Sequence, residues 1–199
     1  MTADYGKELD ASFKNVLHEA GALYGGGGRL AQTMDRLASR VESLRLDYNL
    51  VGGYALILHG VRRFTENIDL LVTEQAVAEI RESKIGHGYT TMPGNSRNIR
   101  DAETGVRTEF VCTGQYPGDG AEKPIAFPDP AEVTEELDGV RVVSLKTLIE
   151  LKLASGMTAK DRLQDLADVQ RLITIHKLTH GYADELHLYV REAFLDLLS

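Results

Sequence analysis

The stretch that decides the fold is VGGYALILHGVRRFTENIDLLV, residues 51–72. Branched apolar residues fill its last part, and we expect a strand over residues 67–72. Near its start, Gly52 and Gly53 stand between an expected strand and a short helix expected over residues 53–59. Glycines at such a point let the backbone approach a phosphate, and the amides of a helix N-terminus attract an anion. A tight strand-to-helix turn is the alternative explanation of the same two glycines.

Polar side chains in two expected strands are the second signal. Asn67 and Asp69 are two residues apart, so they point to the same face of their strand. Their oxygens could share a divalent cation, or they could mark a solvated strand end. Glu109 lies inside an apolar strand expected over residues 106–112, where a carboxylate needs a partner, a metal or water. It is either a third metal ligand from an adjacent strand or the salt-bridge partner of Arg107.

Hydrophobic periodicity and breaker residues predict the remaining elements. They predict helices over residues 8–20, 29–46, 74–84, 144–154, 160–175 and 183–198, and further strands over residues 47–51, 96–101 and 140–143. Ser144 is the expected N-cap of its helix, and Gly156 is expected to end that helix. The order of elements predicts an α+β fold with helices packed against a small mixed sheet.

The same order divides the chain into three expected parts. Residues 1–46 form an N-terminal helical segment, residues 47–143 an α/β core, and residues 144–199 a C-terminal helical segment packed on the core. Residues 114–130 contain four of the five prolines, and we expect them to be mostly loop.

Composition limits the function classes. The 22 Lys and Arg residues against 30 Asp and Glu residues give a net charge of −8, which argues against a generally basic nucleic-acid coat. The single cysteine, Cys112, excludes an internal disulfide framework and a cysteine-based zinc site. No apolar run approaches the length of about 18 residues that a membrane helix needs. The first residues lack the regions of a signal peptide. We therefore expect a cytoplasmic protein without a membrane partner.

Taken together, the motifs resemble those of the nucleotidyltransferase superfamily that includes DNA polymerase β and small bacterial nucleotidyltransferases. The family signature is an apolar residue followed by Gly and Gly or Ser, then about a dozen residues later an acidic, apolar, acidic triplet. Here Val51-Gly52-Gly53 is followed by thirteen residues and then by Asn67-Ile68-Asp69. Glu109 matches the further acidic residue that the family has on a later strand.

Two further motifs resemble the group of AbiE-type toxin nucleotidyltransferases. One is Arg63-x-Thr65, just before the triplet. The other is looser: Lys152 and Ala154, followed by Arg162, Asp165 and Asp168, are similar to that group's helical motif. The resemblance covers about residues 48–175 and implies a nucleotidyltransferase-type sheet with N-terminal and C-terminal helices.

The resemblance implies a reaction and roles for residues. An acceptor hydroxyl would attack the α-phosphorus of an NTP, pyrophosphate would leave, and Mg²⁺ or Mn²⁺ would be the cofactor. The implied metal ligands are Asp69, Glu109 and, more weakly, Asn67. Lys152 and Arg63 would pair with phosphates, the backbone of Gly52 and Gly53 would hold phosphates, and Thr65 would fix its loop by a side-chain to backbone hydrogen bond. Arg63 and Lys152 are alternatively ordinary surface charges.

The sequence departs from the family at Asn67, where the family has a carboxylate. An amide offers one neutral carbonyl oxygen, so the site has lost a full negative charge. Either the protein transfers nucleotides with weaker metal binding, or it is a degraded relative that binds a nucleotide or a partner protein. A third alternative is an unrelated α+β domain in which the motifs coincide.

The acceptor could be RNA, a protein hydroxyl or a small molecule. The net charge weakens the case for RNA, whereas Arg97, Arg100 and Arg107 could form a local basic patch that keeps it open. A toxin-like role with an antitoxin-like partner protein is part of the same expectation.

Overall fold

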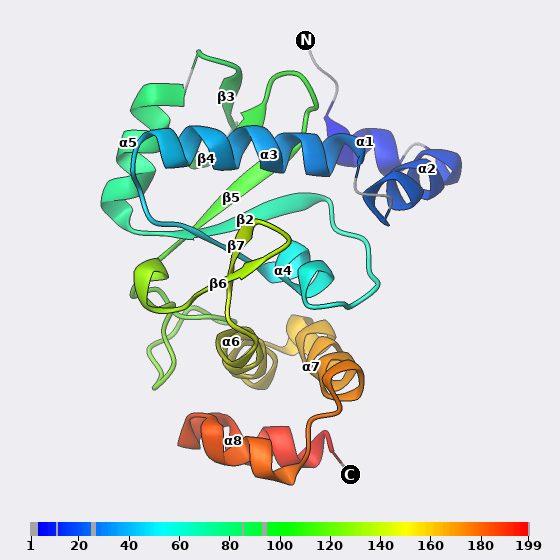
Figure 1. Cartoon of the computed structure of the whole chain (residues 1–199), viewed down its shortest axis with the longest axis vertical. Coiled ribbons are helices and arrows are strands. Elements are labelled where there is room, and N and C mark those ends of the chain that lie inside the picture. The colour runs from blue at the N-terminus through cyan, green and yellow to red at the C-terminus, as the bar shows by residue number, and fades with distance from the viewer. Residues whose placement is uncertain (1–3, 11, 25–26, 85, 93–94, 199) are drawn as a thin grey trace.

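The computed structural model describes residues 4–10, 12–24, 27–84, 86–92 and 95–198 of the chain. In these residues the structure is a seven-stranded mixed sheet in the order β3-β4-β5-β2-β1-β7-β6, flanked by helices (Figure 1). The strands are β1 (Asn49–Val51), β2 (Asn67–Val72), β3 (Tyr89–Met92), β4 (Asn95–Asp101), β5 (Arg107–Cys112), β6 (Thr134–Leu137) and β7 (Val140–Val143). The expected α+β architecture is confirmed, with a larger sheet than the sequence indicated.

Six of the eight α-helices among the described residues lie in two groups, at opposite ends of the molecule (Figure 1). The α-helices are α1 (Tyr5–Asp10), α2 (Phe13–Tyr24), α3 (Gly28–Ser43), α4 (Gly52–Leu58), α5 (Glu74–Lys84), α6 (Leu145–Thr158), α7 (Leu163–His176) and α8 (Leu188–Asp196). Short 3₁₀ turns are η1 (Pro130–Glu132), η2 (Lys160–Arg162) and η3 (His180–Glu185). Helix α3 runs across the sheet beside α1 and α2, whereas α6, α7 and α8 lie together at the opposite end of the molecule (Figure 1).

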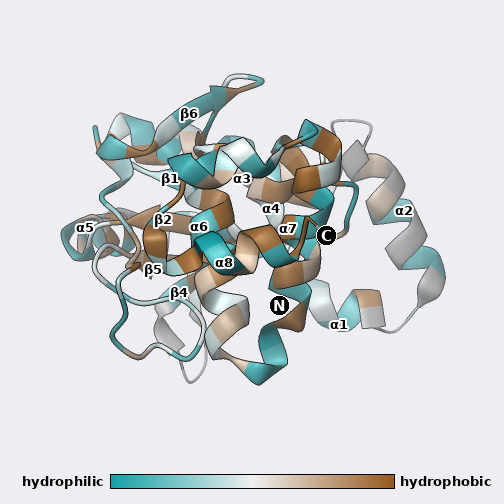
Figure 2. Cartoon of the chain, turned by 90° about the horizontal axis from the view of Figure 1, so that it is seen from below, coloured by the Kyte–Doolittle hydropathy of each residue, from teal (hydrophilic) through white to brown (hydrophobic). Residues whose placement is uncertain are grey.

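The centre of the sheet is the pair of parallel strands β2 and β5, with β1 antiparallel to β2 on the other side. In β2, Ile68, Leu70, Leu71 and Val72 are buried, while Asn67 and Asp69 are half-buried. Figure 2 shows the hydrophobic residues concentrated in these central strands. The apolar content explains why β2 lies in the middle, because a central strand is covered on both faces except where a site opens.

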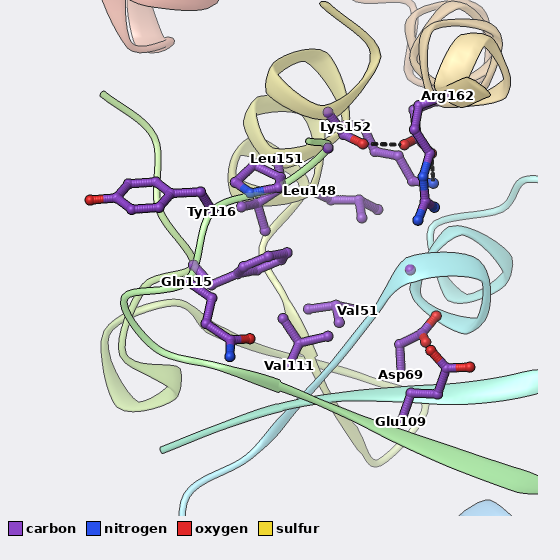
Figure 3. Close-up of a pocket in the computed structure, with 16 residues that line it drawn as sticks. Val51, Asp69, Glu109, Val111, Gln115, Tyr116, Leu148, Leu151, Lys152 and Arg162 are labelled. Atoms are coloured by element: carbon purple, nitrogen blue, oxygen red, sulfur yellow. Dashed lines mark hydrogen bonds and ion pairs between the residues drawn. The ribbon is translucent and has the colours of Figure 1, made fainter. Parts of the chain in front are cut away.

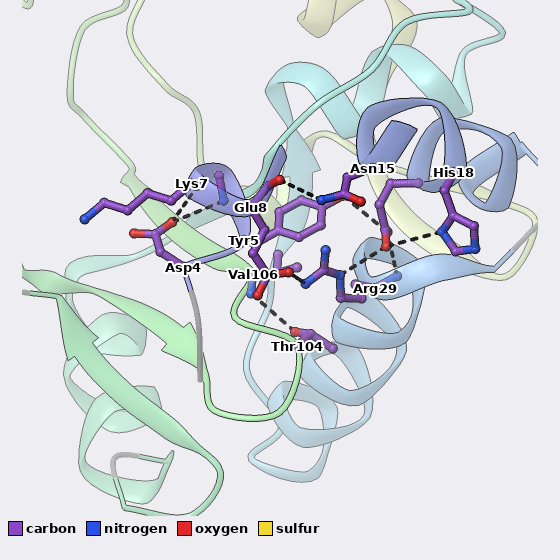
Figure 4. A network of polar contacts seen from close by, with 11 residues as sticks. Asp4, Tyr5, Lys7, Glu8, Asn15, His18, Arg29, Thr104 and Val106 are labelled. Carbon is purple, nitrogen blue, oxygen red and sulfur yellow. Dashed lines mark hydrogen bonds and ion pairs between the residues drawn. The ribbon is translucent and has the colours of Figure 1, made fainter. Parts of the chain in front are cut away.

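The N-terminal helices attach to α3 through an aromatic and ionic cluster (Figure 4). Tyr5 is buried, and the Arg29 guanidinium lies 4.4 Å from the centre of its ring. Arg29 also pairs with Glu8 at 2.7 Å and with Glu19 at 3.1 Å. The helix expected over residues 8–20 is thus two helices, α1 and α2, and both contact the first turn of α3.

Helix α6 shows where one expectation was wrong. Ser144 caps it as predicted, since its Oγ accepts a hydrogen bond from the backbone N–H of Thr147 at 3.3 Å. However, the helix does not end at Gly156 but continues to Thr158. A Cβ on Gly156 would lie 2.6 Å from Cγ and Cδ2 of Leu166, so this glycine allows close contact between α6 and α7.

The two strands that the sequence analysis missed, β3 and β6, are the edges of the sheet, and each has four residues. Strand β6 contains Glu135 and Glu136 in succession. The strand over 67–72 and the helix over 74–84 match their expected bounds. The expected loop over 114–130 is confirmed up to residue 129. No described helix is long and apolar enough to cross a membrane. The three-part division of the chain stays a prediction.

Candidate active site

Two carboxylates meet at the centre of the sheet. Asp69 of β2 and Glu109 of β5 are directly paired in the parallel register, so their backbones are about one strand spacing apart, roughly 4.8 Å. Figure 3 shows both side chains projecting from the same face of the sheet, next to each other. This arrangement is the one expected if the two residues share a cation.

Gly52 lies directly over the Asp69 carboxylate. Strand β1 ends at Val51, which is the register partner of Asp69, and the chain then turns into α4. The φ of Gly52 is +62°, and a Cβ on it would lie 2.0 Å from Oδ2 of Asp69. Both the backbone conformation and the space therefore require glycine. Gly53 has a separate role: its absent Cβ leaves room for Thr65, whose Oγ1 would be 2.6 Å away.

The electrostatics of the site favour a positive ligand. Burial, and next the charge of Glu109, raise the pKa of Asp69 to about 6. Lys152, the backbone N–H of Gly53 and Arg107 act in the opposite direction. Two neighbouring carboxylates, one of them partly removed from water, repel each other, and this repulsion is relieved by a proton or by a cation.

Asn67 and Arg107 complete the same face, two residues before Asp69 and Glu109 in their strands. Nδ2 of Asn67 donates a hydrogen bond to Oδ1 of Asp69 at 2.7 Å. Arg107 forms an ion pair of 2.8 Å with Oε1 of Glu109. The salt bridge that the sequence analysis named as the alternative role of Glu109 is therefore present, and Glu109 borders the pocket as well.

A pocket of about 300 Å³ opens above the two carboxylates (Figure 3). Its polar end is formed by Asp69, Glu109, Lys152, Ser155, Arg162 and Asp165. The apolar end is formed by Val111, Tyr116, Pro117, Phe127, Leu148 and Leu151. Tyr116, Pro117 and Phe127 come from the proline-rich loop, which therefore forms one wall of the site. A charged end beside an apolar end suits a ligand with both kinds of group.

Lys152 borders this pocket from α6, as the resemblance implied, but it does not lie there as an isolated charge. Its Nζ donates to Oδ1 of Asp165 at 2.5 Å and to Oδ2 of Asp168 at 3.1 Å. Both carboxylates are buried, and Ser155 donates a further hydrogen bond to Asp165. The lysine thus joins α6 to α7 at the edge of the pocket.

Arg63 and Thr65 lie outside the pocket lining. Nη1 of Arg63 donates to Oδ2 of Asp168 at 2.6 Å, so Arg63 belongs to the same ionic network as Lys152. Oγ1 of Thr65 donates to the backbone carbonyl of Asn67 at 3.3 Å, which is the side-chain to backbone bond expected of it. Their proposed contacts with a nucleotide stay predictions.

Arg162 is the residue to which the sequence analysis gave no role. It lies in η2, is exposed, and projects into the pocket toward the two carboxylates (Figure 3). Among the described residues, no acceptor or carboxylate pairs with its guanidinium. Its place in the helical motif was the available signal, but the sequence could not show that Lys152 and Arg63 are occupied by aspartates while Arg162 is not.

The site fits a divalent cation that is completed by other ligands. Within the described ranges, no group of three His, Cys, Asp or Glu side chains lies close enough to hold a metal unaided. Mg²⁺, however, is commonly bound by one or two carboxylates together with substrate phosphates and water. Asp69 and Glu109 provide two carboxylates, and Asn67 provides an amide that would present its oxygen by turning over.

The comparisons with known proteins agree with this geometry at the level of the fold. The structure resembles that of ANT(2")-Ia, solved in complex with adenylyl-2"-tobramycin, with a TM-score of 0.53. The match covers 84% of this chain and 98% of that one, at 13% sequence identity.

The chain has a nucleotidyltransferase fold.

An antigenic nucleotidyltransferase-like protein from Paracoccidioides brasiliensis is a further structural neighbour, at 16% identity and a TM-score of 0.43 over 72% of this chain and 75% of that one. No protein-family model matches the sequence, and no curated protein does. The special similarity to AbiE-type toxins therefore stays a prediction.

The basic patch considered for RNA is only partly described. Arg100 pairs with Asp4 at 2.8 Å and Arg107 with Glu109. The side chain of Arg97 lies outside the described residues. The two described arginines are thus each paired with a carboxylate and do not form a patch of unpaired positive charge, so the RNA alternative gains no support.

Proposed function

We propose that this protein is a divalent-cation-dependent nucleotidyltransferase, which transfers a nucleotidyl group from an NTP to an acceptor hydroxyl and releases pyrophosphate. The observation that supports this most strongly is the register pairing of Asp69 with Glu109 beneath Gly52, at the floor of a pocket. The nucleotidyltransferase fold makes the same chemistry the first one to test.

The chain's own groups divide the work of binding. Asp69 and Glu109 would hold Mg²⁺ or Mn²⁺, with Asn67 as a weak additional ligand. Such a cation offsets the charge of the phosphates and lowers the pKa of an acceptor hydroxyl. Arg162, the cation at the pocket without a partner among the described residues, would bind the triphosphate. Helix α4 begins at Gly52, so its positive N-terminal end lies at the same place, where the backbone N–H of Gly53 donates to Asp69.

The apolar end of the pocket supports a substrate with a flat or apolar part. Tyr116, Phe127 and Leu151 offer surfaces on which a nucleobase could stack or pack. The solved neighbour contains an adenylylated small molecule, and this supports a small-molecule hydroxyl as the acceptor. A protein hydroxyl, RNA, and a toxin-like role with an antitoxin-like partner remain alternatives to be tested.

The second candidate function is a catalytically degraded relative that binds a nucleotide or a partner. Asn67 supports it, because its amide donates a hydrogen bond to one of the two oxygens with which Asp69 would bind a cation. A cation has to displace this hydrogen bond, whereas a carboxylate at position 67 would attract the cation instead.

Calorimetry with each of the four NTPs and Mg²⁺ distinguishes the candidates when it is combined with an assay of pyrophosphate release. The variant Asp69→Ala is the negative control, and Asn67→Asp restores the family triplet. Metal-dependent binding and turnover by the native chain support the enzyme. Binding without turnover, with turnover appearing in Asn67→Asp, supports the degraded relative. Absence of nucleotide binding in both chains contradicts the proposed function.

A further inference from the structure

Four side chains form a two-by-two array on one face of the sheet. Asn67 and Asp69 lie on β2, Arg107 and Glu109 lie on β5, and the register pairs Asn67 with Arg107 and Asp69 with Glu109. The hydrogen bond between Asn67 and Asp69 and the ion pair between Arg107 and Glu109 show that each pair along a strand is in contact. The two residues between them, Ile68 and Thr108, are buried on the other face.

The array has an unusual charge for a cation site. Two carboxylates and one guanidinium give a net charge of −1. The neutral amide of Asn67 lies opposite the positive Arg107, so one half of the array lacks negative charge altogether. A first divalent cation at Asp69 and Glu109 would bring the array to +1, and a second one would bring it to +3 without any further carboxylate to accept it. The negative charge of a bound triphosphate reduces the Coulomb repulsion between the cations, but the array itself offers a second cation no carboxylate ligand.

Arg107 is placed to supply the positive charge that a second cation would otherwise supply. It holds Oε1 of Glu109 at 2.8 Å, which leaves Oε2 for another ligand. Arg107 is not among the residues that line the pocket, but its side chain is 45% exposed and its charge acts on Asp69 as well as on Glu109. A phosphate bound to a cation at these two carboxylates would therefore lie near the guanidinium. Guanidinium is well suited to this contact because it binds phosphate oxygens in pairs.

We propose that Arg107 takes the place of a second divalent cation, so that the site binds a single cation together with the nucleotide. This inference rests on the proposed function and makes Arg107 a phosphate-binding residue of the same site. It also explains Asn67: with Arg107 opposite, position 67 needs no carboxylate, because no second cation is bound there.

The proposal predicts effects of opposite sign on two ligands. In Arg107→Gln the loss of positive charge should strengthen Mn²⁺ binding by about tenfold and weaken binding of a non-hydrolysable NTP analogue by about tenfold. Arg107→Lys keeps the charge and should behave like the native chain in Mn²⁺ binding. Arg62→Gln, at an exposed position, removes the same charge elsewhere and is the matched control.

Electron paramagnetic resonance of Mn²⁺ gives the number of bound cations per chain at saturating NTP analogue. We expect one for the native chain and two for the double variant Asn67→Asp/Arg107→Gln. Two cations in the native chain would overturn the proposal, and so would a loss of affinity for both ligands in Arg107→Gln, which a purely structural role predicts. If no variant, the double variant included, binds either ligand while all remain folded, the proposed function itself fails.

Discussion

Gly52 leaves so little room above Asp69 that a single added methyl group would lie 2.0 Å from the carboxylate oxygen Oδ2. The chain turns there with a φ of +62°, immediately after the residue that pairs with Asp69 across β1 and β2. The glycine thus determines where the carboxylate of the site can point, and it leaves the backbone of α4 close to any ligand bound there.

Gly52→Ala should therefore impair ligand binding more severely than it lowers the stability of the fold. We expect the strained φ and the crowding to cost about 1–3 kcal/mol of folding free energy, and Mn²⁺ and NTP binding to be lost because Asp69 must turn away. Gly139→Ala is the matched control, since Gly139 has a φ of +76° with nothing within 4 Å of its added Cβ. Denaturant unfolding and calorimetry of both variants separate backbone strain from crowding. Equal ligand binding by the two would contradict the assigned role of Gly52.

Asp69→Asn should stabilise the metal-free protein at neutral pH. The pKa of Asp69 is raised from an ordinary 3.8 to about 6, so its contribution to stability is fully present below about pH 4 and is lost as the pH rises through 6. Above pH 7 the ionised carboxylate costs about 2–3 kcal/mol, which the amide avoids.

The unfolding free energies of the native chain and of Asp69→Asn, measured from pH 4 to pH 8 in the presence of a chelator, check this expectation. The stability gained by Asp69→Asn should grow between pH 4 and pH 7 and then level off. Asp161→Asn, an exposed carboxylate on η2, is the control and should change stability little. A gain that is constant over the whole range would show that charge is not its cause.

Lys152→Met should be strongly destabilising. The change leaves Asp165 and Asp168 buried with less positive charge around them, and breaking such a network from one side costs about 3–5 kcal/mol. Lys146→Met is the control on the same helix, because the Lys146 side chain is half exposed and its ammonium lies 4.0 Å from Glu150. That pair is worth less than about 1 kcal/mol. Denaturant unfolding should show a severalfold larger loss of unfolding free energy for Lys152→Met than for Lys146→Met. Similar losses in the two variants would rule out the network as a stabilising element.

Arg162→Gln should weaken NTP binding without changing the fold. A guanidinium bound to phosphate contributes about 1.5–3 kcal/mol, so the dissociation constant should rise roughly tenfold or more. Thermal unfolding should be unaffected because Arg162 is exposed and its side chain has no partner among the described residues. Isothermal calorimetry with an NTP and Mg²⁺ measures the change, with Arg62→Gln beside it. Unchanged affinity would remove Arg162 from the binding site.

Gly156→Ala tests the contact between α6 and α7. Alanine favours a helix by about 1 kcal/mol over glycine, but its Cβ would lie 2.6 Å from Leu166, and such crowding costs about 1–3 kcal/mol. We expect a net loss of stability that Leu166→Ala partly relieves, so a double-mutant cycle should give a coupling above about 0.5 kcal/mol. Additive effects would mean that the two side chains do not compete for space.

The central part of the fold was predictable because local pattern and tertiary environment agree there. Strand β2 and helix α5 follow directly from apolar alternation and periodicity. Strands β3 and β6 were missed because edge strands are short and polar, and pairing with a neighbour rather than composition makes them strands. Gly156 was misread because a glycine that ends a helix and one that lets two helices touch look alike in sequence.

The site was predictable in its carboxylates and less so in its cations. Spacing and strand context brought Asp69 and Glu109 together without a structure. No pattern could show that Asp168 neutralises Arg63, or that Lys152 binds two aspartates from α7, because these contacts depend on how separate elements pack against one another. Only the folded structure shows that, among the described residues, the Arg162 guanidinium borders the pocket without a carboxylate partner.

The short, charged strand β6 also limits how this protein can meet others. An open strand edge invites another chain to add a strand, and successive glutamates at positions 135 and 136 make that addition unfavourable through repulsion and desolvation. We therefore expect that a partner protein does not bind by adding a strand to the sheet at β6. Fibre formation by edge-to-edge stacking is opposed at the same place.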